Sequence, residues 1–383
     1  MGKKVMAAGH ICLDITPKFH AGKTRKNNSL FLPGKLVNVG AADISLGGSV
    51  ANTGLAMNFL GADVRLVAKL GIDPFGKIVR EKLRKHKAEL CFVNDKESST
   101  SYSVVIAPPG VDRIFLHDPG TNDTFCAEDI AEEFLEEIVH FHFGYPTLMR
   151  RMYEDGGREL ASILAMVKRH GITTSMDMAA IDPASPAGKA DWRAILALTL
   201  PQVDIFLPSA EEICFMLDRK RYDEWNARTA KKQGADADVM QVLDIEKDIK
   251  PLAIKLLELG AKTVIIKCGA KGIFYKSSGD AEMRKLVSSH RLKKAEWCDL
   301  EGFEPSYLQP NIVSGTGAGD TSIAAFLVSM LDGYSLDRCV KLAAATGACC
   351  ISAYDALSGL EPLDRLWKRI EDGWEKNNRQ NGG

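Results

Sequence analysis

A glycine-rich stretch at residues 314–321, SGTGAGDT, leads directly into the apolar segment 323–331. Residues this small let consecutive backbone N–H groups converge, and the start of a helix adds partial positive charge. Such a loop suits a phosphate group, or the charge that develops on a phosphoryl group during transfer. The candidate anion-binding groups are the amides of Gly317, Ala318 and Gly319, and Asp320 places a carboxylate beside them.

Asp320 has two explanations at this position. An acidic residue in the first turn of a helix commonly complements the helix dipole. The functional explanation makes Asp320 a general base that accepts a hydroxyl proton while the neighbouring amides stabilise the transferring phosphoryl group. The glycine spacing does not complete a dinucleotide fingerprint, and no Gly-Lys-Ser/Thr closes a P-loop. The pattern therefore favours phosphoryl transfer over hydride transfer.

A second glycine-rich loop, residues 47–54, also enters a helical pattern. Gly47 and Gly48 permit the close approach of a ligand, and Asn52 offers both a donor and an acceptor, as a sugar hydroxyl requires. Asp14, at the end of the first strand pattern, could bind a pair of hydroxyls. A strand-to-helix turn with an Asn near its cap also explains the loop, and Asp14 is equally a turn residue.

Two further motifs follow predicted strands. Ser209 and Glu212 fit the S-x-x-E capping box, in which the two residues satisfy the first amides of a helix reciprocally. The functional alternative places Glu212 near a hydrated magnesium ion on nucleotide phosphates. Lys267, Gly269 and Gly272 end another strand, as expected of a backbone that passes under a nucleotide, or of a simple hairpin turn.

Composition limits the classes of partner. The 383 residues carry 49 basic and 50 acidic side chains, so no global charge favours nucleic acid or an anionic membrane. No stretch approaches the roughly 20 apolar residues of a membrane span. The nine cysteines show no zinc spacing and are typical of buried thiols in a reducing compartment. We expect a cytoplasmic protein with a small-molecule partner.

The order of patterns predicts an α/β fold with a doubly wound, mostly parallel sheet and helices on both faces. Short apolar runs such as 64–69, 139–143 and 205–207 alternate with helical patterns. Residues 19–46 and 102–116 alternate apolar and polar instead, as a small antiparallel sheet would. We expect these two segments to form a lid on a core of residues 1–18, 47–101 and 117–383. The charged segment 219–244 is expected to be an exposed insertion or a solvated helix.

The order of these motifs resembles one family, the ribokinase-like carbohydrate kinases, which include the B-type phosphofructokinases and the adenosine kinases. The resemblance covers nearly the whole chain and rests on Asp14, Gly47-Gly48, Asn52, Gly71-x-Asp73-x-x-Gly76, Ser209-x-x-Glu212, Lys267-x-Gly269-x-x-Gly272 and Gly317-Ala318-Gly319-Asp320. It implies that Asp320 is the catalytic base and that the amides of residues 317–319 form its anion hole.

The same resemblance implies roles for the other motifs. The sugar would be held by Asp14, Gly47, Gly48 and Asn52, and Glu212 would organise Mg²⁺ on ATP. The nucleotide would lie along Ser209, Lys267, Gly269 and Gly272. Gly347, on a helix of small residues, is a candidate for the nucleobase wall, although close helix packing also explains it. Ser314 stands where many members have an Asp associated with a monovalent-cation site, so we expect no potassium activation.

We expect an ATP-dependent kinase that phosphorylates a primary hydroxyl of a small sugar or sugar acid. A nucleoside is the alternative acceptor, because Phe19, Phe31 and Phe115 could offer a stacking surface from the lid. A catalytically silent regulator that binds sugar or nucleotide is the alternative from another class. Relatives that dimerise through such lids suggest a homodimer.

Overall fold

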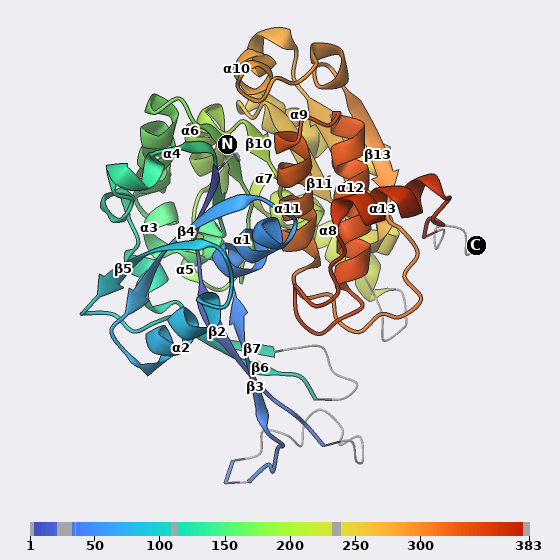
Figure 1. Ribbon diagram of the computed structural model, residues 1–383. Helices are drawn as coiled ribbons and strands as arrows, with labels where there is room; N and C mark the ends of the chain where they lie inside the picture. The colour runs from blue at the N-terminus through green and yellow to red at the C-terminus, as the bar shows by residue number, and fades with distance from the viewer. Residues whose placement is uncertain (1–3, 21–32, 35, 109–113, 232–238, 378–383) are drawn as a thin grey trace.

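The large sheet forms the centre of the molecule (Figure 1). The computed structural model describes residues 4–20, 33–34, 36–108, 114–231 and 239–377. Within these ranges, nine strands form one sheet in the order β13-β12-β11-β10-β9-β8-β1-β4-β5, and only the β13-β12 and β12-β11 pairs are antiparallel. The strands are β1 Lys4–Gly9, β4 Asp63–Gly71, β5 Glu89–Asp95, β8 Ile138–Gly144, β9 Thr173–Met176, β10 Ile205–Phe206, β11 Thr263–Lys267, β12 Gly272–Ser277 and β13 Glu301–Pro305.

Helices cover both faces of this sheet because its strands are buried on both sides. In β1, for example, Val5 and Ala7 belong to one hydrophobic cluster and Met6 and Ala8 to the other. The first cluster includes α1 Ser49–Phe59, α2 Pro74–Leu83, α10 Asp280–His290, α11 Ala318–Leu331, α12 Leu336–Cys350 and α13 Leu363–Glu371. The second includes α3 Arg150–Tyr153, α4 Arg158–Arg169, α5 Pro186–Lys189, α6 Trp192–Thr199, α7 Ala210–Leu217, α8 Arg219–Ala230 and α9 Lys250–Glu258. The predicted doubly wound fold is confirmed.

The sequence patterns did not indicate two elements of the C-terminal third, the helix α10 and the edge strand β13, which pairs antiparallel with β12. The charged segment 219–244 agrees with the expectation of a solvated helix over its first part, where only Trp225 and Thr229 are buried. Its first part is the helix α8, but Trp225 is fully buried and donates to Asp248 Oδ1 at 3.2 Å. One apolar anchor therefore ties this polar helix to the core.

A small sheet projects from one end of the molecule (Figure 1). Its order is β3-β2-β6-β7, with β2 Cys12–Pro17, β3 Ala42–Gly47, β6 Tyr102–Ile106 and β7 Ile114–Asp118. The β2-β6 pair is parallel, so the sheet is mixed rather than purely antiparallel. This pairing arises because the chain passes through α1, β4, α2 and β5 before it returns as β6. Its division from the core as a separate lid stays a prediction, and β2 lies within residues 1–18, which we assigned to the core.

Two residues, His10 and Ile11, join β1 of the large sheet to β2 of the small sheet. The amide of His10 donates to the Gly144 carbonyl at 3.2 Å, and its carbonyl accepts from the Val50 amide at 3.1 Å. The side chain of Asn122 accepts from the Ile11 amide at 3.2 Å and donates to the Ile11 carbonyl at 2.9 Å. The backbone of this junction is therefore fully hydrogen-bonded.

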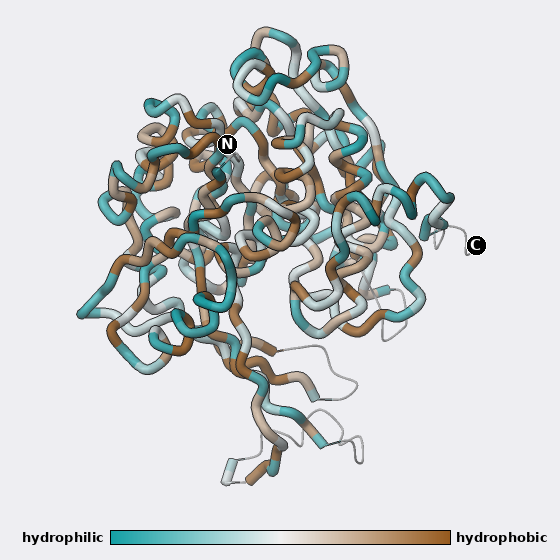
Figure 2. Tube along the Cα trace, in the orientation of Figure 1, coloured by the Kyte–Doolittle hydropathy of each residue, from teal (hydrophilic) through white to brown (hydrophobic). Residues whose placement is uncertain are grey.

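The surface of the small sheet carries apolar side chains. Exposed residues there include Ile44, Ile114, Phe115 and Leu116, and the tube in Figure 2 is brown along parts of these strands. Phe31, expected as part of a stacking surface, lies outside the described residues. No helix in the described ranges is long and apolar enough to cross a membrane. All nine cysteines are free thiols, and seven of them are buried.

Candidate active site

The two glycine-rich loops each begin a helix, and the two helices pack together. Gly48 precedes α1 and Gly317 precedes α11. Asn52, in the first turn of α1, donates from Nδ2 to Asp320 Oδ2 in the first turn of α11 at 2.9 Å. This bond joins residues 268 positions apart in the sequence. The structure therefore brings the predicted sugar loop and the predicted anion loop to one place.

Asp320 is held at both oxygens. The Tyr145 hydroxyl donates to Oδ1 at 2.6 Å, while Asn52 occupies Oδ2. The carboxyl is 4% exposed, and this burial raises its pKa. The hydrogen bonds from Tyr145 and Asn52, and the positive charge of Lys267, pull the pKa in the opposite direction. Asp320 is thus a buried, oriented carboxyl whose pKa lies above the ordinary aspartate value.

The anion loop has the geometry that its small residues predict. Gly317 takes the left-handed conformation, with φ of 76°, and a Cβ there would lie 2.4 Å from Ala356 Cβ. Because Gly317 caps α11, the amides of Gly319 and Asp320 have no partner within the helix. A Cβ at Gly315 would meet nothing within 4 Å. Packing does not explain that glycine, and its open surroundings leave room for a ligand.

Tyr145 was missed by the sequence reasoning. It directly follows β8 and has φ of 61°, a conformation that is rare for a bulky residue and that concentrates at functional sites. Its amide donates to Asp177 Oδ1 at 3.3 Å. Burial and then the nearby Asp320 charge raise the pKa of its hydroxyl well above the ordinary tyrosine value, so it remains a proton donor. A Gly-Tyr-Pro sequence at the carboxyl end of a predicted strand was the available signal.

Asp177 is a second carboxyl that the motifs did not indicate. It follows β9, is fully buried, and has no partner for Oδ2 among the described residues. Burial raises its pKa strongly; the charge of Lys267 opposes this shift, and those of Asp320 and Glu212 add to it. Burial thus favours the neutral acid of Asp177 more than it would for an exposed aspartate.

A row of buried polar side chains on β8 and β9 extends from Asp177. His142 Nε2 lies 3.6 Å from Asp177 Oδ1, and its Nδ1 lies 2.9 Å from Ser175 Oγ. The row continues through His140 and Thr173, at 2.8 Å for each contact. Burial lowers the pKa of His142 to about 3 and that of His140 well below its usual value. The lowered pKa values favour neutral rings, so the row places no full positive charge beside Asp177.

Ser209 and Glu212 form the capping box predicted for α7. Ser209 Oγ accepts from the Glu212 amide at 3.3 Å, and Glu212 Oε2 accepts from the Ser209 amide at 2.7 Å. Burial raises the pKa of Glu212, and the nearby Lys267 ammonium opposes that shift. Lys267 Nζ donates to the Leu207 carbonyl at 2.7 Å. The capping explanation is confirmed, and the magnesium role of Glu212 stays a prediction.

The predicted sugar residues meet at the base of the small sheet. Asp14 lies in the middle of β2, not at the end of the first strand as we expected. A Cβ on Gly47 would lie 2.4 Å from Asp14 Oδ2, and one on Gly48 would lie 2.6 Å from His10 Nδ1. Both glycines are thus required by close approach. Burial raises the pKa of Asp14. His10 and His117, which sequence reasoning missed, face each other here at 3.4 Å between their Nε2 atoms.

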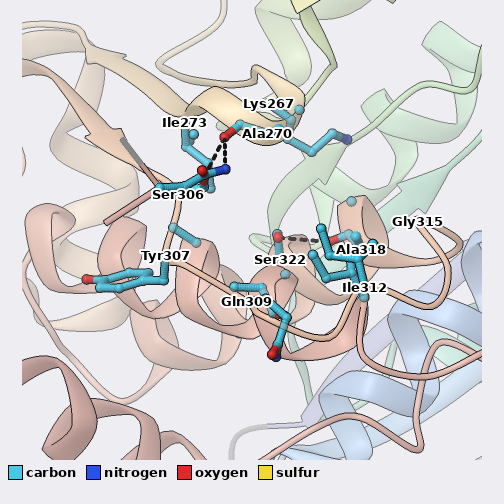
Figure 3. A pocket seen from close by; sticks show the side chains of 18 of the residues that line it. Lys267, Ala270, Ile273, Ser306, Tyr307, Gln309, Ile312, Gly315, Ala318 and Ser322 are labelled. Atoms are coloured by element: carbon cyan, nitrogen blue, oxygen red, sulfur yellow. Dashed lines mark hydrogen bonds between the residues drawn. The ribbon is translucent and has the colours of Figure 1, made fainter. Parts of the chain in front are cut away.

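A cavity of about 360 Å³ lies between the β11–β12 turn, the loop after β13, and helices α11 and α12 (Figure 3). The predicted nucleotide residues Lys267, Gly269, Gly272 and Gly347 line it. Gly347 also serves helix packing, because a Cβ there would lie 2.5 Å from Ser322 Oγ. The helix-packing explanation of this glycine is confirmed, and its place in a nucleobase wall stays a prediction.

A second cavity, of about 390 Å³, adjoins the first. It is lined by Tyr145, Ser209, Glu212 and Asp320, among others. The two cavities share Lys267, Gly269, Gly315, Ala318 and Gly319. Asp320 and the anion loop thus stand where an elongated ligand would pass from one cavity into the other.

Comparison with known proteins agrees with this geometry. The model of the pfkB family of carbohydrate kinases matches residues 7–362. The chain belongs to the pfkB family of carbohydrate kinases. This family makes it a phosphotransferase that acts on a sugar hydroxyl. The resemblance read from the motifs is confirmed.

Individual relatives of this carbohydrate kinase are distant. An uncharacterized sugar kinase of Archaeoglobus fulgidus is 24% identical over 310 residues, which cover 80% of this chain and 98% of the relative. The structure of Arabidopsis thaliana ribokinase with ribose and ATP aligns with a TM-score of 0.68 at 19% identity, covering 97% of this chain and 99% of that one. A ribokinase II of E. coli, solved with ATP and Mg²⁺, aligns with a TM-score of 0.67 at 19% identity, and the alignment again covers 97% of this chain and 99% of that one. These structures share the fold of this chain.

Proposed function

We propose that this carbohydrate kinase transfers the γ-phosphoryl group of ATP to a primary hydroxyl of a small sugar or sugar acid. One observation carries the proposal: Asp320 is buried and hydrogen-bonded at both oxygens beside the glycine loop, at the meeting point of the two cavities. A helix-dipole role for Asp320 would require neither contact. Both contacts instead orient a base toward a reacting group.

In the proposed reaction, the acceptor hydroxyl gives its proton to Asp320 and its oxygen attacks the γ-phosphorus. The bond from that phosphorus to the bridging oxygen breaks, and ADP leaves. The anion hole differs from the predicted set 317–319, because the Ala318 amide donates to the Gly315 carbonyl at 3.4 Å. The amides of Gly319 and Asp320, together with the helix N-terminus, stabilise the charge on the transferring group. Lys267 adds positive charge at the same point, because it lines both cavities.

Mg²⁺ fits this site only in its usual hydrated form. No cluster of three or more His, Cys, Asp or Glu in the described ranges could hold a metal by itself. Mg²⁺ commonly keeps several waters and binds through one or two carboxylates and substrate phosphates. Glu212 lines the second cavity, and we assign this residue to the ion. The ion would neutralise charge on the phosphates.

We assign the acceptor to the base of the small sheet. Asp14 supplies a carboxyl for a pair of hydroxyls, and Gly47 and Gly48 keep the backbone close. Asn52 has its amide nitrogen on Asp320, which leaves its carbonyl oxygen to meet a sugar hydroxyl. The ribose of the Arabidopsis ribokinase complex supports a sugar as acceptor class.

The test is phosphotransfer from ATP and Mg²⁺ across a panel of sugars, sugar acids and nucleosides. We expect turnover with at least one sugar or sugar acid, and a rise in the thermal midpoint with ATP and Mg²⁺ but not with NAD. Turnover with nucleosides alone would replace the acceptor class. Stabilisation by NAD without any phosphotransfer would contradict the kinase function.

Association of two copies through the small sheet is also a proposal. The exposed side chains of Ile44, Ile114 and Leu116 give that sheet an apolar surface which a second copy would cover. Sedimentation velocity should show a dimer that dissociates when Ile114 and Leu116 are both replaced by Ser. A monomer at all concentrations of the unaltered protein would contradict the proposal.

A further inference from the structure

Tyr145 occupies the position at which an acceptor must meet the base. Its hydroxyl lies 2.6 Å from Asp320 Oδ1, and Asn52 takes Oδ2. A hydroxyl that passes its proton to Asp320 must come within about the same distance of one of these oxygens. Tyr145 also lines the second cavity, together with Asp320, so its hydroxyl stands at the proposed point of transfer.

The two partners of Asp320 differ in what can replace them. The Asn52 amide is a neutral N–H donor on the first turn of α1. The Tyr145 contact is an O–H donor to a carboxylate, the same type of bond that an acceptor hydroxyl forms. An acceptor hydroxyl can therefore replace the phenol as the donor to Asp320. One hydrogen bond is exchanged for another, so the net change in free energy at Asp320 is small.

The backbone of Tyr145 keeps its ring at this position. Its left-handed conformation is stabilised by the hydrogen bond from its backbone amide to Asp177. The next residue is Pro146, whose ring fixes its own φ. The Tyr145 ring lies 6.0 Å from the His10 ring, which in turn contacts His117 of the small sheet. Tyr145 thus lies between the base and the region that we assign to the acceptor.

We propose that Tyr145, given Asp320 as the base proposed above, holds Asp320 in a resting state until an acceptor displaces the phenol hydroxyl. A sugar can open this contact because its other hydroxyls bind elsewhere in the site and supply the necessary free energy. A water molecule has no such additional contacts. The result is selection against transfer of the phosphoryl group to water.

The resting contact also weakens Asp320 as a base. A hydroxyl that donates to a carboxylate stabilises its ionised form and lowers its pKa. A weaker base activates water less well. Displacement of Tyr145 by a sugar restores basicity at the moment when the correct acceptor is present.

The test compares Tyr145→Phe with the unaltered enzyme. We expect ATP hydrolysis without acceptor to rise roughly tenfold, the scale of one hydrogen bond to a charged group. Sugar phosphorylation should change much less, so that the ratio of phosphotransfer to hydrolysis falls. The acidic limb of the pH profile of hydrolysis should move to higher pH, because the loss of the hydroxyl raises the pKa of Asp320. An unchanged ratio and an unmoved limb would overturn the proposal.

Tyr153→Phe is the matched control. This tyrosine packs against Trp192, outside both cavities. The substitution removes the same phenol hydroxyl as Tyr145→Phe. It should leave both rates unchanged. A merely structural role for Tyr145 predicts that both activities and the melting temperature fall together. If Tyr145→Phe does not fold, Tyr145→Leu also lacks the donor and should give the same change in ratio.

Asp320→Asn, assayed in parallel, separates the two proposals. If it loses both activities while Tyr145→Phe leaves the ratio unchanged, Asp320 remains the base and the role of Tyr145 is wrong. If Asp320→Asn keeps full activity, the proposed base is itself wrong.

Discussion

The two ends of the candidate site are built in different ways. At the transfer end, buried side chains hold one another in fixed positions, as Tyr145 and Asn52 hold Asp320. At the other end, the lining of the cavity is mostly small or apolar residues, such as Gly347, Ala348 and Ile351. Under the proposed function, chemistry at the transfer end depends on single atoms, whereas binding of the nucleobase at the other end would be spread over many weak contacts. Substitutions at the two ends should therefore differ in both size and kind.

The largest effect is expected from Asp320→Asn. The substitution keeps the shape of the side chain and removes the base, so kcat should fall roughly 10²–10⁴-fold. The affinity for ATP should change little, because the glycine-loop amides remain. Steady-state kinetics, ATP titration and a melting curve of the purified variant provide the check. Near-normal turnover with a stability loss of about 0.5–1 kcal/mol would instead support the helix-dipole explanation.

The pH dependence should follow the ionisation of Asp320. Its pKa is raised by burial, and only the ionised form accepts a proton. Activity is therefore expected to be present above the raised pKa and to fall about tenfold per pH unit below it. The acidic limb of kcat/KM should lie above the ordinary aspartate range near 3.9. A limb at or below that range would remove Asp320 as the titrating base.

A smaller effect is expected at the nucleobase end from Asn377→Ala. Asn377 lines the first cavity, where we expect the nucleotide to bind, and its Nδ2 donates to the Ala270 carbonyl at 3.3 Å. Loss of one such neutral contact should raise the KM for ATP by roughly 2–10-fold and leave kcat unchanged. Asp372→Ala, at an exposed position in the same C-terminal region, is the control. A large fall in kcat would show that the two ends are not separate.

The smallest effect is expected from the monovalent cation. Ser314 carries no carboxylate, and its hydroxyl donates to Thr316 Oγ1 at 3.0 Å. Rates in potassium and sodium buffers of equal ionic strength should therefore agree within a few-fold. Strong, selective activation by potassium would show that other groups build a cation site near the transfer end.

The same contrast explains what the sequence could predict. Glycine loops and capping boxes are local signals, because a conformation or a close approach restricts the residue type at a few consecutive positions. Gly317 and the Ser209–Glu212 capping box were visible for that reason. Tyr145 and Asp177 act only through contacts with distant segments, and no local spacing records which strands end side by side.

The same reasoning applies to the elements. Central strands and helices were predicted because their apolar periodicity reflects burial on both faces of the sheet. The edge strand β13 lacks that pattern, since Glu301 is exposed and Gly302 and Phe303 are half-buried. Its place depends on pairing with β12, a tertiary contact. The parallel β2-β6 pair was missed for the same reason, because the order in which a chain returns to a sheet is not a local property.

The junction at His10 and Ile11 determines how the small sheet can move. A rigid swing about this point would break four hydrogen bonds, at a cost of roughly 2–6 kcal/mol. Farther out the sheet is narrower, because Thr16 and Pro17 of β2 pair with β3 but lie beyond the reach of β6. The small sheet is thus held like a cantilever: its root is clamped beside the proposed catalytic residues, while its far end has fewer strand partners. The outer end of the small sheet can then deform while the junction at its inner end keeps its geometry, within the same four strands.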